Sequence, residues 1–452
     1  MSELYELTAA EAAARIRARD LSPVELMESL LDRAQRLEPR LKVWVTLDPD
    51  AAMSAARQRE REIEAGAPAG VLHGVPVGVK DIYYTKGVRT TAGSPIYADF
   101  VPEYDATSVA LLKSAGAVIM GKTVTTEFAC MDPPPTRNPW DPAHTPGGSS
   151  TGSAVGVATG IFPVALGSQT GGSVLRPASY NGVVGLKPTF GRISRHGVFP
   201  VAASLDTMGT FSRTVEDAAL LLKVMAGQDE YDPSSSGRPV PDYRHAIDSW
   251  DRAPRIGLVR WLFTEEAAPE VRIHTEQVMK RLSGAGAEIE DAAVSFSFED
   301  LLAAHLVIMS SEAADVHSDD FAARVDDYGP NLRGLIEDGL GASAVDYLQA
   351  KQTVQAFRAE LEEAIRGYDV LVTPTTATPA PRDLTTTGPA MFQSPWTASG
   401  FPTITLPSGL SESGLPLGIQ LGAAPFDESR LLAVARWCEQ ALEVSLTPPG
   451  LD

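Results

Sequence analysis

"GGSSTGSAVGVATGIFPVALGSQTGGSVLRPASYNG", residues 147–182, consists mainly of glycine, serine and small apolar residues and carries a single charged side chain, Arg176. The chain as a whole is 21% charged, with a formal net charge of -20. Gly152, Gly156 and Gly160 have the spacing that lets a helix approach its neighbour closely. The uncharged run is short for a membrane span, and a proline interrupts it. It therefore predicts a buried helix whose glycine face lies against a sheet.

Outside this stretch, short apolar runs alternate with helical patterns from about Gly70 onward. The predicted strands lie within 74–81, 117–123, 254–262, 368–376, 401–409 and 415–422. The predicted helices lie within 108–116, 212–227, 268–286 and 427–443. Alternation of this kind is typical of an α/β fold in which helices cover both faces of a sheet.

The first 65 residues follow a helical pattern, and capping boxes open two of the helices, at Thr8–Glu11 and at Ser22–Glu25. We expect residues 1–65 to form a helical region packed on the core. Residues 66–452 are expected to form one compact α/β domain. The N-terminus is charged and lacks an apolar secretory segment, so we expect a cytoplasmic location.

The composition narrows the classes of function. An acidic surface would repel nucleic acid and anionic membranes, so neither is expected as a partner. Two cysteines, Cys130 and Cys438, are too few for a disulfide framework or a cysteine-based metal site. The histidines show no zinc-binding spacing. We therefore expect no metal and no cofactor.

Two known motifs share features with the glycine-rich stretch: a phosphate-binding loop and the nucleophile elbow. A phosphate-binding loop is excluded, because Ser153 stands where its lysine should be. Residues 148–152 match G-x-S-x-G, the nucleophile elbow of serine esterases. The elbow needs a buried strand before it and a histidine after it. The preceding residues are rich in proline, and His305 and His317 lie in a helical pattern, so the esterase is kept only as an alternative.

Lys80 ends the apolar strand predicted at 74–81. One interpretation is a lysine at a strand end that reaches into solvent. The other is a lysine held in an apolar site, where desolvation lowers its pKa until the neutral amine acts as a base. The residues around Lys80 leave both interpretations open.

Several blocks together resemble the amidase signature family of hydrolases. The resemblance runs from about Gly70 to the C-terminus, and a large mixed, twisted β-sheet covered on both faces by helices is the fold it implies. The blocks that carry it are "GVPVGVKD" (74–81), "TPGGSSTGSAVGVATG" (145–160), "ALGSQTGGSVLRPASYNGVVGLKPTFGRIS" (165–194), "SLDTMGTFSRTVEDAALLL" (204–222), "YDVLVTPT" (368–375) and "GLPLGIQL" (414–421).

The resemblance implies a catalytic set of Ser173 as nucleophile, Ser149 as bridging serine and Lys80 as base. The family's spacing of 24 residues between the two serines is met, since 173 − 149 = 24. In the family the bridging serine follows a cis peptide bond. The backbone N–H groups of Thr170, Gly171, Gly172 and Ser173 would form the oxyanion hole. Water and stray charge would have to be excluded from such a site, which accounts for the uncharged stretch.

The nucleophile motif departs from the family's common D-T-G-G-S-I-R pattern and resembles a malonamidase-type variant. Gln169 replaces the acid, Leu175 fills the usual arginine position, and Arg176 follows one residue later. Arg176 is either a structural arginine paired with a carboxylate or a donor to a carboxylate or carbonyl group of the substrate. Both alternatives stay open.

Four further residues are candidates for substrate contacts. Ser150 and Gln169 stand in the two signature blocks, and the family places the backbone near Cys130 beside the leaving group. Cys130 is otherwise a small core residue. Trp396 stands in "MFQSPWTASGF" (391–401), which we expect to form part of a pocket wall tolerant of aromatic groups.

The function that follows is an amidohydrolase acting on C–N bonds other than peptide bonds, in small amides and also in carbamates (urethanes). One alternative within the family is the glutaminase component of a tRNA-dependent amidotransferase, which the acidic charge and the Gln169 and Arg176 variant disfavour. Alternatives of another class are the serine esterase and a non-catalytic binding protein. The expected partner is a small-molecule substrate, and a homodimer is left open as the assembly.

Overall fold

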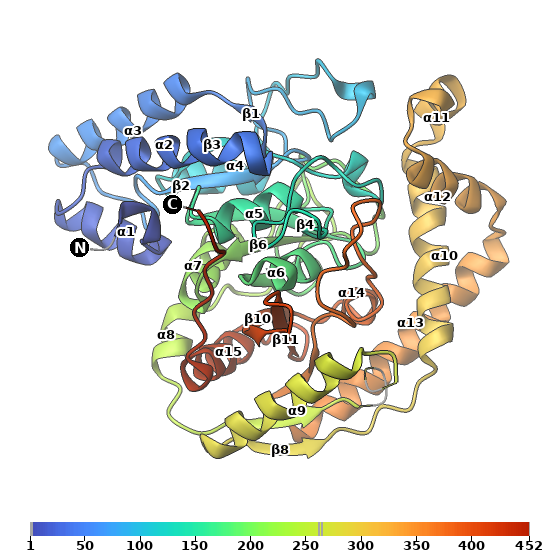
Figure 1. Cartoon of the computed structure of the whole chain (residues 1–452). Coiled ribbons are helices and arrows are strands. Elements are labelled where there is room, and N and C mark those ends of the chain that lie inside the picture. The colour runs from blue at the N-terminus through green and yellow to red at the C-terminus, as the bar shows by residue number, and fades with distance from the viewer. Residues whose placement is uncertain (1–2, 261–262, 264, 452) are drawn as a thin grey trace.

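The computed structural model describes residues 3–260, 263 and 265–451 (Figure 1). Within these residues eleven strands form one sheet. The strands are β1 (Trp44–Leu47), β2 (Pro76–Lys80), β3 (Val118–Thr123), β4 (Val164–Gln169), β5 (Val184–Lys187), β6 (Thr207–Ser212), β7 (Arg255–Leu258), β8 (Glu288–Asp291), β9 (Val370–Pro374), β10 (Thr403–Leu410) and β11 (Pro416–Gly422).

Fifteen α-helices of the described residues surround the sheet. They are α1 (Ala9–Ala18), α2 (Pro23–Leu41), α3 (Pro49–Glu64), α4 (Thr107–Ser114), α5 (Thr151–Ala158), α6 (Leu175–Asn181), α7 (Val215–Met225), α8 (Tyr243–Asp248), α9 (Pro269–Gly284), α10 (Phe298–Val316), α11 (Ser318–Arg324), α12 (Pro330–Gly341), α13 (Ala344–Ala364), α14 (Ser394–Ala398) and α15 (Glu428–Leu442).

The sheet is mixed, with strand order β1-β3-β2-β4-β6-β5-β10-β11-β9-β7-β8. β2 is parallel to both β3 and β4, and β7 is parallel to both β8 and β9, whereas the other pairs are antiparallel. Helices α5 and α6 pack against the middle strands as one group, and α7 and α15 as another, with α8 packed on α7 and α15. The predicted α/β fold with a large mixed sheet is confirmed. Part of the strand predicted at 254–262, namely residues 261 and 262, lies outside the described residues.

The first part of the glycine-rich stretch forms the predicted buried helix close to the sheet, but α5 ends at Ala158, so Gly160 lies beyond the helix. A Cβ atom on Gly152 would lie 2.4 Å from the carbonyl oxygen of Val43, and one on Gly156 would lie 2.0 Å from the ring of Phe162. Any side chain at these positions would push α5 off the strands beneath it. No helix among the described residues has both the length and the apolar character that crossing a membrane requires.

The N-terminal region shares the main core instead of forming a separate unit. One hydrophobic cluster extends from Leu7 to Leu451. Both predicted capping boxes are present, with the hydroxyls of Thr8 and Ser22 at the helix starts. β1 was not expected within 1–65; it pairs antiparallel with β3 and thereby joins this region to the edge of the sheet.

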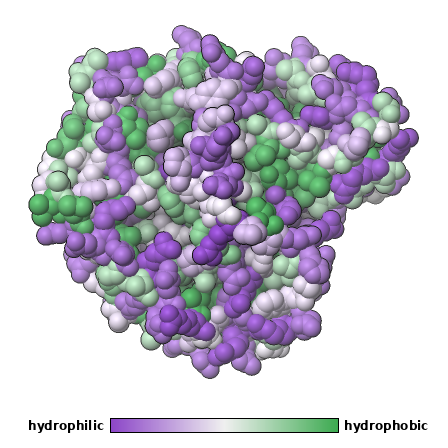
Figure 2. All heavy atoms as spheres, turned by 180° about the vertical axis from the view of Figure 1, so that it is seen from behind, coloured by the Kyte–Doolittle hydropathy of each residue, from purple (hydrophilic) through white to green (hydrophobic). Residues whose placement is uncertain are grey.

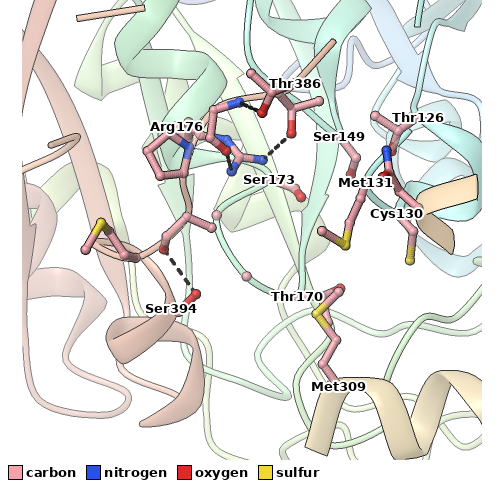
Figure 3. A pocket seen from close by; sticks show the side chains of 18 of the residues that line it. Thr126, Cys130, Met131, Ser149, Thr170, Ser173, Arg176, Met309, Thr386 and Ser394 are labelled. Carbon is pink, nitrogen blue, oxygen red and sulfur yellow. Dashed lines mark hydrogen bonds between the residues drawn. The ribbon is translucent and has the colours of Figure 1, made fainter. Parts of the chain in front are cut away.

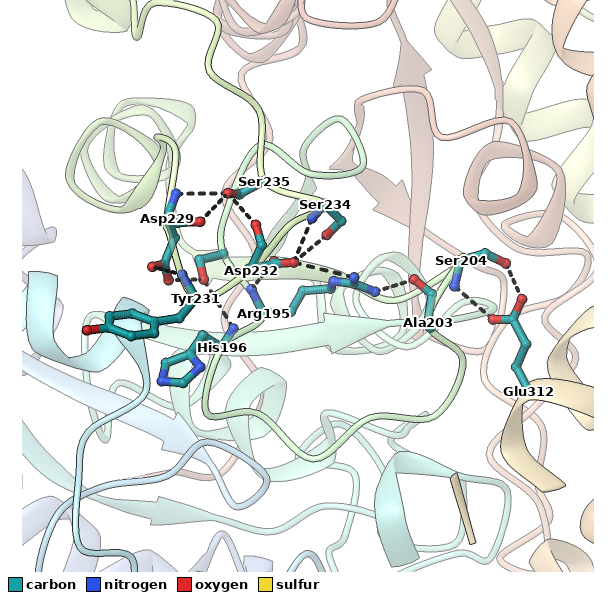
Figure 4. A network of polar contacts seen from close by, with 11 residues as sticks. Arg195, His196, Ala203, Ser204, Asp229, Tyr231, Asp232, Ser234, Ser235 and Glu312 are labelled. Atoms are coloured by element: carbon teal, nitrogen blue, oxygen red, sulfur yellow. Dashed lines mark hydrogen bonds and ion pairs between the residues drawn. The ribbon is translucent and has the colours of Figure 1, made fainter. Parts of the chain in front are cut away.

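Helices α10 to α13 form an arm that lies beside the sheet, on the right in Figure 1. α10 packs on α12 and α13 and reaches the core at α14. Its Glu312 accepts hydrogen bonds from the backbone N–H and the hydroxyl of Ser204, at 2.7 and 2.5 Å, which ties the arm to the loop before β6 (Figure 4). The rear face of the molecule is largely hydrophilic with scattered apolar patches, as the acidic composition leads one to expect (Figure 2).

Candidate active site

Lys80 ends β2, a strand that is buried along its whole length between two parallel neighbours. The side chain is completely buried. Its Nζ lies 2.7 Å from Ser149 Oγ and 2.9 Å from Ser168 Oγ. The first alternative for this residue, a lysine that reaches into solvent, is therefore wrong.

The surroundings of Lys80 favour the neutral amine. Burial lowers the pKa of Lys80 to about 7, and the nearby Asp206 and Cys130 oppose this shift only in part. Asp206 is itself buried, and burial raises the pKa of its carboxyl group. At neutral pH a large fraction of Lys80 is therefore unprotonated and able to accept a proton.

Ser149 stands at the start of α5, after a cis peptide bond between Gly148 and Ser149. Its carbonyl oxygen accepts hydrogen bonds from the N–H groups of Thr126, at 3.2 Å, and Thr151, at 2.9 Å. These contacts fix the backbone, so the side chain faces Lys80 on one side and the cavity on the other. The cis bond stands where the family resemblance puts one.

Ser173 lies in the loop that joins β4 to α6, and it is 8% exposed, so its hydroxyl is accessible from the cavity. In the described part of the chain, none of the N–H groups of residues 170–173 donates to a protein acceptor. No hydrogen bond joins the hydroxyls of Ser149 and Ser173 among the residues described. Catalytic contacts of this kind often tighten only when substrate binds.

The two serines open into one cavity of about 440 Å³, a volume typical of sites for small molecules. Ser149 and Ser173 lie between Arg176 on one side and Cys130 and Met131 on the other (Figure 3). The cavity is otherwise mainly apolar toward the α10 arm. The apolar side chains that line it include Ala129, Met131, Leu302, Leu306, Met309, Pro389, Ala390 and Met391.

Arg176 lines the same cavity from α6 and is 6% exposed. Its guanidinium donates to the carbonyl oxygens of Gly388, at 2.5 Å, and Gly148, at 2.7 Å, and to Thr387 Oγ1, at 3.1 Å. Within the described residues no carboxylate lies at ion-pairing distance, so the alternative of a paired structural arginine is wrong. The Nε–H group has no partner among them either. Burial lowers the pKa of Arg176 to about 10, which still leaves it charged at neutral pH.

The other predicted substrate contacts divide into one that lines the cavity and three that do not. Cys130 lines it, and burial raises the pKa of its thiol, so it stays protonated. Ser150 instead exchanges two hydrogen bonds with the backbone of Ser168. Gln169 accepts from the N–H groups of residues 174 and 175 at the start of α6. Trp396 packs against Gly422 in a second hydrophobic cluster and lies outside the cavity lining.

Three residues near the reacting groups were not predicted. Ser168 contacts Lys80 from β4, and Asp206 accepts from Thr170 Oγ1 at 2.5 Å. His305, which the sequence places in a packed helix, also reaches the cavity, where its Nε2 lies 2.8 Å from the carbonyl oxygen of Thr170. The helical pattern around His305 gives no signal of this contact. Within the described residues, no group of three or more histidine, cysteine, aspartate or glutamate side chains is placed to hold a metal ion.

Comparison with known proteins shows the family to which the chain belongs. The model of the family described as Amidase matches residues 25–432. AmiD of Mycobacterium tuberculosis, which carries the name of an amidase, is 39% identical over 451 residues, covering 97% of this chain and 94% of its own. A glutamyl-tRNA(Gln) amidotransferase component of Carboxydothermus hydrogenoformans is 37% identical, covering 99% and 100% of the two chains. The structure of native peptide amidase from Stenotrophomonas maltophilia superposes with a TM-score of 0.86 at 31% identity, covering 99% of each chain.

Proposed function

Because the chain belongs to the amidase family, and is thus a hydrolase of C–N bonds, we propose that it cleaves small amides and carbamates through an acyl-enzyme on Ser173. The observation that carries the mechanism is the 2.7 Å contact between the buried Lys80 Nζ and Ser149 Oγ, at the floor of a cavity that also exposes Ser173. Ser173, Ser149 and the buried Lys80 thus supply a nucleophile, a relay and a base, and none of these three roles falls to a histidine.

The proton moves along this set in two linked transfers. Neutral Lys80 accepts the proton of Ser149 as Ser149 accepts that of Ser173, and Ser173 Oγ forms a bond to the substrate carbonyl carbon. The same proton then returns through Ser149 to the leaving nitrogen as the C–N bond breaks. Water, activated by the same route, later hydrolyses the ester on Ser173. Ser168 would hold Lys80 in line with Ser149 through its 2.9 Å contact.

The negative charge that develops on the carbonyl oxygen needs donors that are already oriented. The unpaired N–H groups of the 170–173 loop are available for this purpose. A carbamate presents the same carbonyl carbon and the same leaving nitrogen as an amide, so the mechanism applies to both. The apolar wall of the cavity favours an alkyl or aryl acyl group.

A panel of substrates tests the reaction class. We expect turnover of butyramide, butyryl 4-nitroanilide and ethyl N-phenylcarbamate, with release of the amine measured by absorbance or by mass spectrometry. Hydrolysis of 4-nitrophenyl butyrate without any activity on the amides and the carbamate would instead support the serine esterase. A complete lack of turnover and of reaction with a fluorophosphonate would support a binding protein.

The glutaminase alternative rests on the 37% identity to the amidotransferase component. It predicts that free glutamine is the best substrate of the panel and that its hydrolysis depends on added partner proteins. The proposed function predicts that the isolated chain turns over the small amides by itself. Glutamine is therefore included in the panel at the same concentration as butyramide.

Arg176 is expected to select for an anionic or carbonyl group at the far end of the substrate. Its charged guanidinium lines the cavity, and a charge-assisted contact with a carboxylate contributes roughly a 10-fold preference or more. Arg176→Met should therefore reduce kcat/KM for malonamate, a half-amide of a diacid, by a factor roughly 10-fold larger than for butyramide. Equal losses on both substrates would show that Arg176 serves only to hold Gly148 and the 387–388 segment.

A further inference from the structure

Two consecutive carbonyl groups of the 170–173 loop accept hydrogen bonds from side chains of distant helices. His305 Nε2, on α10, lies 2.8 Å from the carbonyl oxygen of Thr170. Thr397 Oγ1, on α14, donates to the carbonyl oxygen of Gly171 at 2.7 Å. Both side chains are buried, and they hold the loop from two different segments of the chain.

These contacts determine where the next N–H groups point. A peptide unit is planar, and in a trans unit the C=O and N–H bonds point in opposite directions. Among the described residues only the bond before Ser149 is cis, so the units after Thr170 and Gly171 are trans. Fixing the carbonyl of Thr170 thus fixes the N–H of Gly171, and fixing the carbonyl of Gly171 fixes the N–H of Gly172. Both glycines line the cavity.

We propose that His305 and Thr397 are positioning residues that aim the N–H groups of Gly171 and Gly172 at the oxyanion. This inference rests on the proposed function, because it assumes that the 170–173 loop stabilises a tetrahedral intermediate. Neither side chain touches the substrate carbonyl in this role. Each acts through the peptide unit that it holds.

Both side chains are themselves held in place. Gln169 Nε2 donates to Thr397 Oγ1 at 3.0 Å. The threonine hydroxyl therefore accepts a hydrogen bond from Gln169 and donates one to the carbonyl oxygen of Gly171. This assigns a task to Gln169, which stands where the family commonly has an acid. On α10, Glu312 lies two turns after His305 and anchors the helix to Ser204 (Figure 4).

The chemistry of His305 suits a fixed donor. A carbonyl oxygen only accepts, so the Nε2 atom must carry a proton. Burial lowers the pKa of His305, which keeps the ring neutral at neutral pH. The loop is therefore held by a neutral donor and not by a full positive charge.

The test removes and then restores the donor at position 305. His305→Phe keeps a ring of similar size without a donor, and His305→Gln places an amide N–H near the position of Nε2. We expect His305→Phe to lower kcat on butyryl 4-nitroanilide roughly 10-fold, with KM changed less than about twofold, and His305→Gln to recover most of the loss. His305→Asn, whose amide is too short to reach the loop, replaces His305→Phe if the latter does not fold.

A second readout does not depend on the choice of substrate. An alkyl fluorophosphonate forms an O–P bond to an activated serine with loss of fluoride, and its phosphoryl oxygen takes the place of the oxyanion. The labelling rate should fall with His305→Phe and recover with His305→Gln. At position 397, Thr397→Val should lower both rates and Thr397→Ser should retain them. The control is His274→Gln. His274 is a half-buried histidine that contacts Ser408 on β10, and its replacement should leave both rates unchanged.

Three results would overturn the inference. The first is an equal loss in His305→Phe and His305→Gln, which would mean that the ring only fills space. The second is a rise in KM with kcat unchanged, which would make His305 a substrate contact. If Ser173→Ala itself remained active and were labelled at another residue, the proposed function would fail first. The third result, an inactive Ser173→Ala together with a fully active His305→Phe, would reject the positioning role alone.

Discussion

Ser173→Ala is expected to lower kcat on butyryl 4-nitroanilide by about 10⁵-fold or more, a loss of the size that removal of a catalytic serine causes in other serine hydrolases. The reason is that the substitution removes the atom that forms the acyl-enzyme. Substrate binding should persist, because the apolar wall and Arg176 remain. Purified variant and wild type are compared by release of 4-nitroaniline, and KM or the dissociation constant is measured in parallel.

The matched control for this variant is Ser179→Ala. Ser179 lies on α6, the helix that follows Ser173, and its buried hydroxyl has no hydrogen-bond partner among the described residues. Its removal should leave kcat within about twofold of wild type, since no hydrogen bond is lost with an unpaired hydroxyl. Ser173→Ala with activity near that of Ser179→Ala would contradict the acyl-enzyme mechanism.

The second large effect is expected for Lys80→Met, which keeps a long side chain in the buried site and removes the base. We expect kcat/KM to fall by roughly 10³-fold or more, because general-base catalysis and the orientation of Ser149 are lost together. The melting temperature should not fall, since the variant no longer has to bury an ionisable amine. Activity and thermal unfolding are measured on the same preparation.

The pH dependence of kcat/KM in the wild type shows which protonation form of Lys80 is active. The pKa of Lys80 is lowered to about 7, and the neutral amine is the active form, so kcat/KM should rise as the pH increases through about 7 and level off above it. Lys187→Met is the control, because Lys187 is also fully buried with a pKa lowered to about 7, but among the described residues its amine donates a hydrogen bond to the carbonyl oxygen of Pro188 and not to a serine. Its pH profile should match that of wild type. A profile that falls toward alkaline pH would rule out Lys80 as the base.

The sequence predicted the parts of the fold that depend on local pattern. The apolar run before Lys80 formed β2, and the capping boxes at Thr8 and Ser22 opened α1 and α2. β1 was missed because it is a strand of four half-buried residues that exists through its pairing with β3. The order of the strands in the sheet is likewise set by long-range pairing, which no local pattern contains.

The candidate site was likewise predicted only in part: the catalytic residues were predicted, and most of the residues around them were not. Lys80, Ser149 and Ser173 were predicted through the family resemblance; Ser149 and Ser173 line one cavity, and the buried Lys80 contacts Ser149. The surroundings of these residues were not predicted, because they come from elements remote in sequence. His305 reaches the loop from α10, and within the described residues the acceptors of Arg176 are all neutral, two of them more than 200 residues away. Trp396 was misplaced because an aromatic residue near a pocket-forming segment gives no information on which way its side chain faces.

The rate at which an alkyl fluorophosphonate labels Ser173, measured from pH 5 to 9 with the site of labelling identified by mass spectrometry, tests the Ser173, Ser149 and Lys80 assignment most directly. The measurement requires no knowledge of the natural substrate. The account predicts a single adduct on Ser173, a rate that rises to half its maximum near pH 7, and loss of that rise in Lys80→Met. An adduct on another residue, or a labelling rate that Lys80→Met leaves unchanged, would contradict it.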